Sequence, residues 1–142
     1  MRSRKKDRRP PIVVVDDEHE RLVDLALSRM DRMPGAVVLF AELARAKTVV
    51  RLPPDAIGIN SVATFDYDGA QYRDFVLVEP HHADFSNGRI SILTPVGAML
   101  LGLSEGQTME WTGDDGRTHR VRVEQVQESL AQLTPIHAST TG

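Results

Sequence analysis

The sequence has no cysteine among its 142 residues. Disulfide bonds, thiolate zinc sites, iron–sulfur clusters and cysteine nucleophiles are therefore excluded, and a cytoplasmic protein is expected. Aromatic residues are scarce, at 5%, which argues against an aromatic-lined ligand pocket or a base-stacking platform. No apolar run approaches the roughly 18 residues of a membrane-spanning helix. The apolar run at residues 12–15 is also too short for a signal peptide, so we expect no membrane association.

Basic residues are concentrated at the start of the chain. The net charge is −3, but residues 1–9 carry six basic side chains and one acidic one, whereas the remainder has 11 basic and 19 acidic residues. The six are Arg2, Arg4, Lys5, Lys6, Arg8 and Arg9. Two interpretations stay open for this basic leader: a contact with the phosphates of a nucleic acid, or a disordered, solubilising terminus.

Residues 12–52 show a helical periodicity with one interruption. Asp17 stands three residues before Glu20, the spacing of a helix capping box. Apolar residues then recur every three or four positions as far as Met33, which predicts an amphipathic helix, and a second helix is predicted over residues 36–47. Because only Pro34–Gly35 separates them, we expect an antiparallel helical hairpin, a short coiled coil.

From residue 60 onward the apolar period changes to two, which is typical of strands. Strands are predicted over 61–67, 71–79, 89–93, 107–112 and 117–126, with Asp68–Gly69 as a hairpin turn. Residues 95–101 form a short apolar helix with Thr94 as its N-cap. Since that helix has no polar face, we expect an antiparallel sheet wrapped around it. The fold class is α+β.

These patterns divide the chain into four parts. They are a disordered basic leader (1–11), the helical hairpin (12–52), the sheet domain (53–128) and a flexible tail (129–142).

Several strings of residues resemble a known family. GRISILTPVGAMLLGLSEGQ, residues 88–107, resembles the signature of the C-terminal domain of the Gre transcript-cleavage factors. IVVVDDEHERL at residue 12 and AELARA at residue 41 are similar to their shorter relatives, the regulators of nucleoside diphosphate kinase (Rnk). The most specific strings are NSVATF at residue 60 and TPVGAMLLGL at residue 94, and the similarity covers about residues 12–127.

The resemblance implies an FKBP-like sheet-and-helix domain that docks on RNA polymerase near its secondary channel, with the helical hairpin directed toward that channel. It places the docking surface at the strand-to-helix corner, which is Leu93, Thr94, Pro95 and Val96. Gre factors tend to have an Asp or Asn at the position of Leu93, so this corner lacks one polar group of the family pattern.

The predicted hairpin tip, Met30, Asp31, Arg32 and Met33, lacks the paired acids with which Gre factors hold a catalytic Mg²⁺. Asp31 is the only acid there, and the neighbouring Arg32 disfavours a cation. We therefore expect no catalytic residue, no metal site and no cofactor. The loop with His81, His82 and Asp84 has ligand types without metal-site spacing to further partners, and is interpreted as solvated.

These observations favour a non-enzymatic, monomeric regulator of transcription. It would bind RNA polymerase, modulate elongation in competition with Gre factors and affect nucleoside diphosphate kinase levels. Two alternatives stay open: a Gre-like stimulator of transcript cleavage that uses Asp31 alone, and an adaptor that binds another protein such as nucleoside diphosphate kinase.

Overall fold

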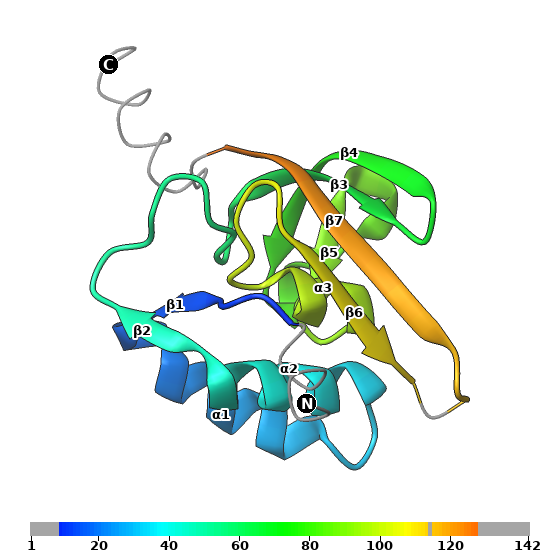
Figure 1. Ribbon diagram of the computed structural model, residues 1–142. Helices are drawn as coiled ribbons and strands as arrows, with labels where there is room; N and C mark the ends of the chain where they lie inside the picture. The colour runs from blue at the N-terminus through cyan, green and yellow to red at the C-terminus, as the bar shows by residue number, and fades with distance from the viewer. Residues whose placement is uncertain (1–8, 114, 128–142) are drawn as a thin grey trace, which may run out of the picture.

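The structure is a computed structural model that describes residues 9–113 and 115–127. In chain order (Figure 1) its elements are β1 (Val13–Val15), α1 (Asp16–Arg29), α2 (Pro34–Arg45), β2 (Lys47–Val49), β3 (Val62–Tyr67), β4 (Ala70–Val78), the 3₁₀ turns η2 (Pro80–His82) and η3 (Phe85–Asn87), β5 (Arg89–Ser91), α3 (Pro95–Leu100), β6 (Thr108–Thr112) and β7 (Thr118–Gln127). The predicted tail and most of the predicted leader lie outside the described residues. Within the described ranges, no helix has both the length and the apolar character needed to cross a bilayer.

Five strands form one curled sheet in the order β5-β4-β3-β7-β6. The Asp68–Gly69 turn between β3 and β4 is confirmed, since both residues have positive φ, 52° and 91°, as in a tight two-residue hairpin. The boundaries of the five predicted strands each lie within two residues of the prediction. The expectation of a purely antiparallel sheet is wrong, because β5 runs parallel to β4. The chain crosses back between these two strands through η2 and η3 before it re-enters the sheet.

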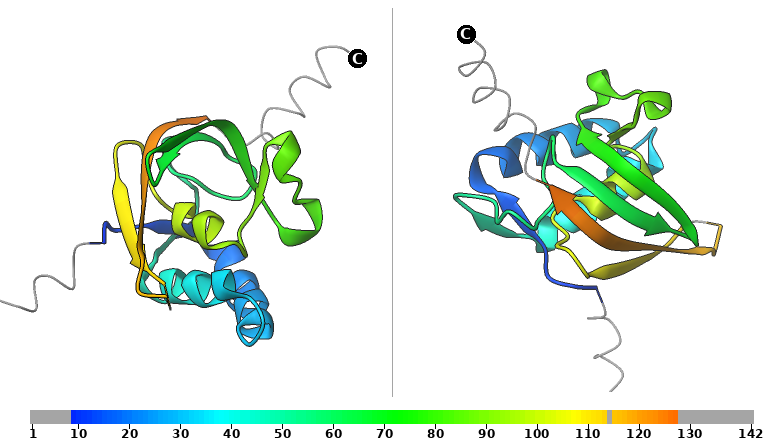
Figure 2. Two further views of the ribbon diagram at one scale, coloured as in Figure 1. Left: turned by 90° about the vertical axis from the view of Figure 1, so that its right-hand side faces the viewer. Right: turned by 90° about the horizontal axis from the view of Figure 1, so that it is seen from above.

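The sheet curls around α3, which Figure 2 shows on its concave side. Four of the helix residues, from Gly97 to Leu100, are buried. The Thr94 hydroxyl accepts a hydrogen bond from the backbone N–H of Gly97 at 3.1 Å, so the predicted N-cap is confirmed. The mixed α+β fold with a curled sheet is confirmed with it, whereas the FKBP-like description stays a prediction.

The first part of the chain contains two short strands in addition to its two helices. β1 and β2 flank the helices and pair in parallel as a separate two-stranded sheet, which the periodicity did not predict. α1 begins at Asp16 with Val15 as N-cap and no side-chain cap, so the predicted Asp17 capping box is wrong: β1 leads directly into the helix. α1 also ends at Arg29 and not at Met33, and in the turn that follows the backbone N–H groups of Arg32 and Met33 both donate to the Arg29 carbonyl, at 3.0 and 2.9 Å.

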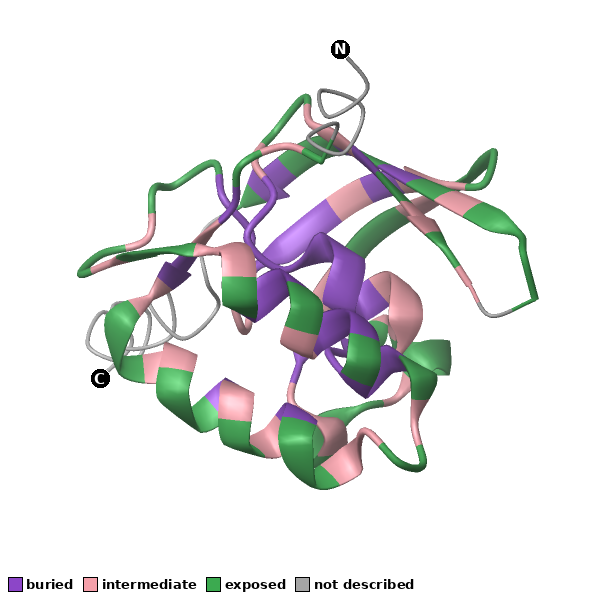
Figure 3. Cartoon of the chain, turned by 60° about the horizontal axis from the view of Figure 1, so that its bottom comes forward, coloured by how far each residue is buried: buried purple, intermediate pink, exposed green. Residues whose placement is uncertain are grey.

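One hydrophobic core joins the two parts of the molecule. α2 packs against both α1 and α3, which makes it the inner helix of the pair and α1 the outer one. Figure 3 shows the buried residues concentrated in α2, α3 and the inner face of the sheet. Ile12 and Val14 are 1% and 2% exposed, so the start of the described chain also belongs to this core. The coiled-coil description of α1 and α2 stays a prediction.

Candidate docking surface

Three hydrogen bonds that involve side chains hold the corner between β5 and α3. The backbone N–H of Leu93 donates to the Ser91 hydroxyl at 2.9 Å, and the Thr94 hydroxyl donates to the Ser91 carbonyl at 2.8 Å while it caps α3. Pro95 occupies the first turn of the helix, where a missing N–H costs nothing. The corner is therefore a rigid feature of the fold.

The four predicted docking residues differ in exposure. Leu93 is 1% exposed and belongs to the core, whereas Thr94, Pro95 and Val96 are half-buried. A partner at this corner would thus contact Thr94, Pro95 and Val96. Leu93 would support these residues by packing beneath them in the core. The burial explains why position 93 holds an apolar leucine, because a charged side chain buried there without a partner would destabilise the fold.

α2 lies directly against the corner through a glycine. A Cβ atom built on Gly35 would lie 1.8 Å from the carbonyl oxygen of Leu93 and 2.6 Å from the carbonyl carbon of Thr94. Only a residue without a side chain permits this approach of two backbones. Because Gly35 follows the predicted tip by two residues, the structure brings the tip and the corner together.

The tip itself has an exposed and a packed side. Asp31 and Arg32 have side chains that are 81% and 68% exposed, and their charged atoms lie 3.8 Å apart. Met30 and Met33 are partly buried and pack against the core. Only the two charged residues of the tip are therefore presented freely to solvent.

An apolar cavity of about 110 Å³ lies next to the corner. Its walls are Phe65, Tyr67, Tyr72, Phe85, Ile90 and Val96. Val96 belongs to both the corner and the cavity, and Phe85 is 56% exposed at the edge. The expectation that scarce aromatics argue against an aromatic-lined pocket is therefore wrong, because the fold gathers four of the seven aromatic residues around this cavity.

The aromatic cluster is continuous with the sheet beyond the cavity. Phe65 and Tyr72 stack with ring centroids 5.3 Å apart. His119 stacks between Tyr67 and Trp111, with centroids 5.9 Å and 5.8 Å away. Such contacts stabilise the cluster beyond its apolar burial. The result is a row of packed rings that runs from the cavity toward the end of the sheet.

Asp68 fixes the end of this cluster. One carboxylate oxygen lies 2.7 Å from Nδ1 of His119, and the other accepts the backbone N–H of Arg120 at 2.8 Å. Partial loss of hydration raises the pKa of Asp68, but the hydrogen bonds from His119 and Arg120 outweigh it and leave the pKa below its ordinary value. The carboxylate therefore holds the His119 ring in its stacked position.

The other candidates from the sequence lie elsewhere. Of the six basic residues of the leader, five fall outside the described residues, and Arg9 contacts Glu42 on α2. His81 and His82 are exposed, with ring centroids 4.0 Å apart. The side chains of Ser86 and Asn87 both donate hydrogen bonds to Asp84, and this lowers the pKa of its carboxyl group.

Chemically, the corner, the tip and the cavity suit binding. Across residues 9–113 and 115–127, no three His, Cys, Asp or Glu side chains gather as a metal-ion cluster would require. The cavity offers aromatic and aliphatic walls, and the charged groups of the tip lie apart from it. This combination matches the apolar centre and polar rim of a protein–protein interface.

Two family models match successive parts of the chain. A family model described as "Transcription elongation factor, GreA/GreB, C-term" matches residues 52–128, and one described as "Rnk N-terminus" matches residues 10–49. The chain is 35% identical over 108 residues to "Regulator of nucleoside diphosphate kinase" of Escherichia coli (strain K12), which covers 72% of this chain and 79% of that protein.

The chain is also similar to elongation factors. "Transcription elongation factor GreA" of Thermodesulfovibrio yellowstonii is 40% identical over 75 residues, which span 49% of this chain and 46% of that protein. The solved structure "Prokaryotic transcription elongation factor GreA/GreB from Nitrosomonas europaea" is 37% identical with a TM-score of 0.62, and the match covers 83% of this chain and 98% of that one. The chain therefore belongs to the Rnk family, the regulators of nucleoside diphosphate kinase, with an Rnk N-terminus joined to a GreA/GreB C-terminal domain.

Proposed function

We propose that this protein binds RNA polymerase near its secondary channel and regulates elongation without catalysing a reaction of its own. Membership of the Rnk family and similarity to elongation factors support a role in transcription. The observation that carries the proposal is the contiguity of the corner and the tip, since Gly35 seats the base of the tip on Leu93 and Thr94. A polymerase that meets the corner would meet the tip on the same face.

The cavity beside the corner supplies the apolar part of that surface. An apolar side chain of the polymerase would enter between Phe85, Tyr72 and Val96, which are already placed by the stacked rings around them. Burying one such side chain contributes about 1.5–3 kcal/mol. Phe85 is the cavity residue most open to a partner, since it is 56% exposed.

The tip supports occupancy of the channel entrance more than catalysis. α1 has 14 residues, a length of about 21 Å at 1.5 Å per residue. α2 returns along the body of the protein and packs on α3, which keeps the tip close to the corner. Asp31 offers one carboxylate with Arg32 beside it, whereas Mg²⁺ recruitment is favoured by several oxygen ligands. Steric competition with Gre factors follows from such a position.

Two variants test the docking surface. Core RNA polymerase is expected to co-purify with the wild-type chain, and Phe85→Ser is expected to weaken binding about tenfold, as loss of roughly 1.4 kcal/mol of apolar contact implies. Val50→Ser is the matched control, because Val50 is an exposed apolar residue (86%) away from the cavity. Absence of polymerase binding by the wild type would refute the function. Equal binding by both variants would refute only the role of the cavity.

Transcript cleavage separates the regulator from a Gre-like stimulator. We expect negligible and equal cleavage of backtracked complexes with the wild type and with Asp31→Ala. Cleavage that the wild type stimulates and Asp31→Ala loses would establish the stimulator instead. Direct capture of nucleoside diphosphate kinase without polymerase subunits would favour an adaptor, whereas an effect on the level of that kinase would follow from altered transcription.

A further inference from the structure

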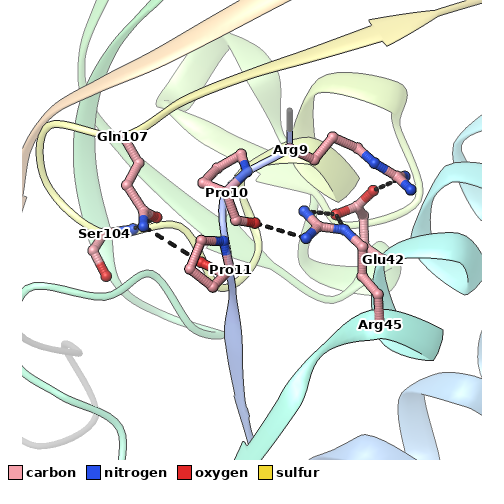
Figure 4. Close-up of polar contacts among 7 residues, drawn as sticks. All are labelled: Arg9, Pro10, Pro11, Glu42, Arg45, Ser104 and Gln107. Atoms are coloured by element: carbon pink, nitrogen blue, oxygen red, sulfur yellow. Dashed lines mark hydrogen bonds and ion pairs between the residues drawn. The ribbon is translucent and has the colours of Figure 1, made fainter. Parts of the chain in front are cut away.

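α2 carries a buried carboxylate near its C-terminal end. Glu42 is 1% exposed, in a helix whose other buried residues are apolar. A carboxylate removed from water is strongly destabilising unless cations and hydrogen-bond donors surround it. The partners of Glu42 therefore show what this charge is for (Figure 4).

Two arginines divide the carboxylate oxygens between them. Arg45, on the same helix, donates from Nε to Oε1 at 2.9 Å, and its Nη2 lies 2.6 Å from the same oxygen. Arg9 donates from Nη1 to Oε2 at 3.2 Å. Arg9 is the last of the six basic residues of the leader, and it comes from 33 positions earlier in the chain. Glu42 therefore binds the end of the leader to α2.

The two residues after Arg9 are held by their carbonyl oxygens. Proline has no backbone N–H, so the carbonyl is the only polar group that Pro10 and Pro11 offer. Nη1 of Arg45 donates to the Pro10 carbonyl at 2.6 Å, and Nε2 of Gln107 donates to the Pro11 carbonyl at 3.4 Å. Oε1 of Gln107 accepts the backbone N–H of Ser104 at 2.8 Å, which orients its amide.

The chain then enters the core where the Rnk N-terminus meets the GreA/GreB domain. The carbonyl of Ile12 accepts the N–H of Lys47 at 3.0 Å, and the N–H of Val13 donates to the carbonyl of Gly102 at 3.3 Å. Residues 9–12 are thus attached on one side to α2 and β2 and on the other to the loop of residues 102–107.

We propose that residues 9–12 are a strap that fastens the Rnk N-terminus to the GreA/GreB domain, with Arg9 as its salt-sensitive anchor on Glu42. Arg9 is a positioning residue in this role. Its side chain is 42% exposed, whereas that of Arg45 is 21% exposed. Added salt therefore screens the Arg9 contact more than the Arg45 contact. The strap needs no polymerase, so it stands apart from the proposed function.

Hydrogen exchange of the full chain tests the strap at two amides. The N–H groups of Val13 and Lys47 report its seating, because Val13 donates to Gly102 of the GreA/GreB domain and Lys47 donates to Ile12 at the end of the strap. Arg9→Gln and Glu42→Gln are each expected to speed exchange at both amides about fivefold, as loss of a partly exposed charged pair implies. The double variant is expected to exchange no faster than Glu42→Gln. Arg51→Gln, an exposed arginine after β2, is the control and should exchange like the wild type.

Salt provides a second readout that a purely structural defect would not move. Raising the salt concentration from about 0.05 to about 0.5 M shortens the screening length several-fold, and it should speed exchange at Val13 in the wild type but not in Arg9→Gln. Wild-type exchange rates in Arg9→Gln would overturn the proposal. So would an equal response to salt in Arg9→Gln and the wild type. Arg9→Gln changes a partly exposed side chain, so this test does not depend on whether Glu42→Gln folds.

Discussion

α1 and α2 are neighbours of similar length, 14 and 12 residues, but their environments are opposite. α2 buries half of its residues and lies between α1 and α3. α1 buries only Leu22 and Ala26, carries three acidic residues in its first turn and leaves Leu27 53% exposed. The comparison shows that the helix pair is built onto the domain and is not a free-standing finger. α2 belongs to the core, and α1 covers it.

Charges follow the same division. The ion pair that ties α1 to the sheet domain, Arg21 with Glu79, is short at 2.7 Å but exposed, with side chains 45% and 27% accessible. Such a pair contributes about 0–1 kcal/mol. The pairs of α2 converge on the buried Glu42. Loss of α1 contacts should therefore loosen the outer layer, whereas loss of α2 contacts should unfold the protein.

The largest effect is expected from one leucine on each helix. Leu39→Ala on α2 removes a side chain that is 0% exposed, and should lower the free energy of unfolding by about 2–5 kcal/mol. Leu27→Ala on α1 is the matched control, and should cost less than about 1 kcal/mol because its side chain is already half in water. Urea denaturation measures both. Similar losses for the two variants would show that α1 and α2 share the core equally.

An intermediate effect is expected at Gly35, where α2 meets the corner. In a helix without neighbours, Gly→Ala stabilises by up to about 1 kcal/mol. Here the new Cβ would lie 1.8 Å from the Leu93 carbonyl oxygen, so Gly35→Ala should instead destabilise by about 1–3 kcal/mol. Urea denaturation gives the sign of the change in unfolding free energy, and a gain in stability would contradict the close approach of the two backbones. Gly113→Ala is the control, since its closest neighbour is a side-chain atom of Asp115 at 3.2 Å.

The course of the backbone could be predicted where local patterns determine it. The Asp68–Gly69 turn and the Thr94 cap follow from residue types at adjacent positions, and both are confirmed. The pairing of β1 with β2 and the parallel run of β5 could not be predicted in this way. Each of those strands has three residues, too few for an apolar period, and their directions depend on the path of the intervening chain.

The site was predictable in part, since the sequence contains one local signal for the aromatic cavity. A two-residue turn at Asp68–Gly69 places Phe65 opposite Tyr72, as the observed register does. That pairing brings two aromatics together on one face, and so contradicts an exclusion based on the number of aromatics alone. The approach of Gly35 to Leu93 left no such signal, because it joins positions 58 residues apart through backbone atoms. The assignment of the corner as a docking surface stays a prediction.

The smallest effect is expected from an acid on the outer helix. Burial raises the pKa of Glu18 above its ordinary value of 4.5; the charges of Glu79 and Asp17 add to this, and Arg21 opposes it. A raised pKa in the folded state contributes stability that is fully present below 4.5 and is lost as the pH rises through the folded pKa. At neutral pH the ionised carboxylate is therefore unfavourable in the folded state, and Glu18→Gln should stabilise by less than about 1 kcal/mol.

The pH dependence of this gain distinguishes it from a change in helix propensity. The difference in unfolding free energy between Glu18→Gln and the wild type should be largest near pH 7 and should vanish below about pH 4, where both side chains are uncharged. Glu20→Gln, an exposed position two residues further along α1, controls for the change of residue type. A gain that persists unchanged at acid pH would show that packing or propensity is its cause. In that case the outer helix would carry no electrostatic strain, and its contrast with α2 would rest on burial alone.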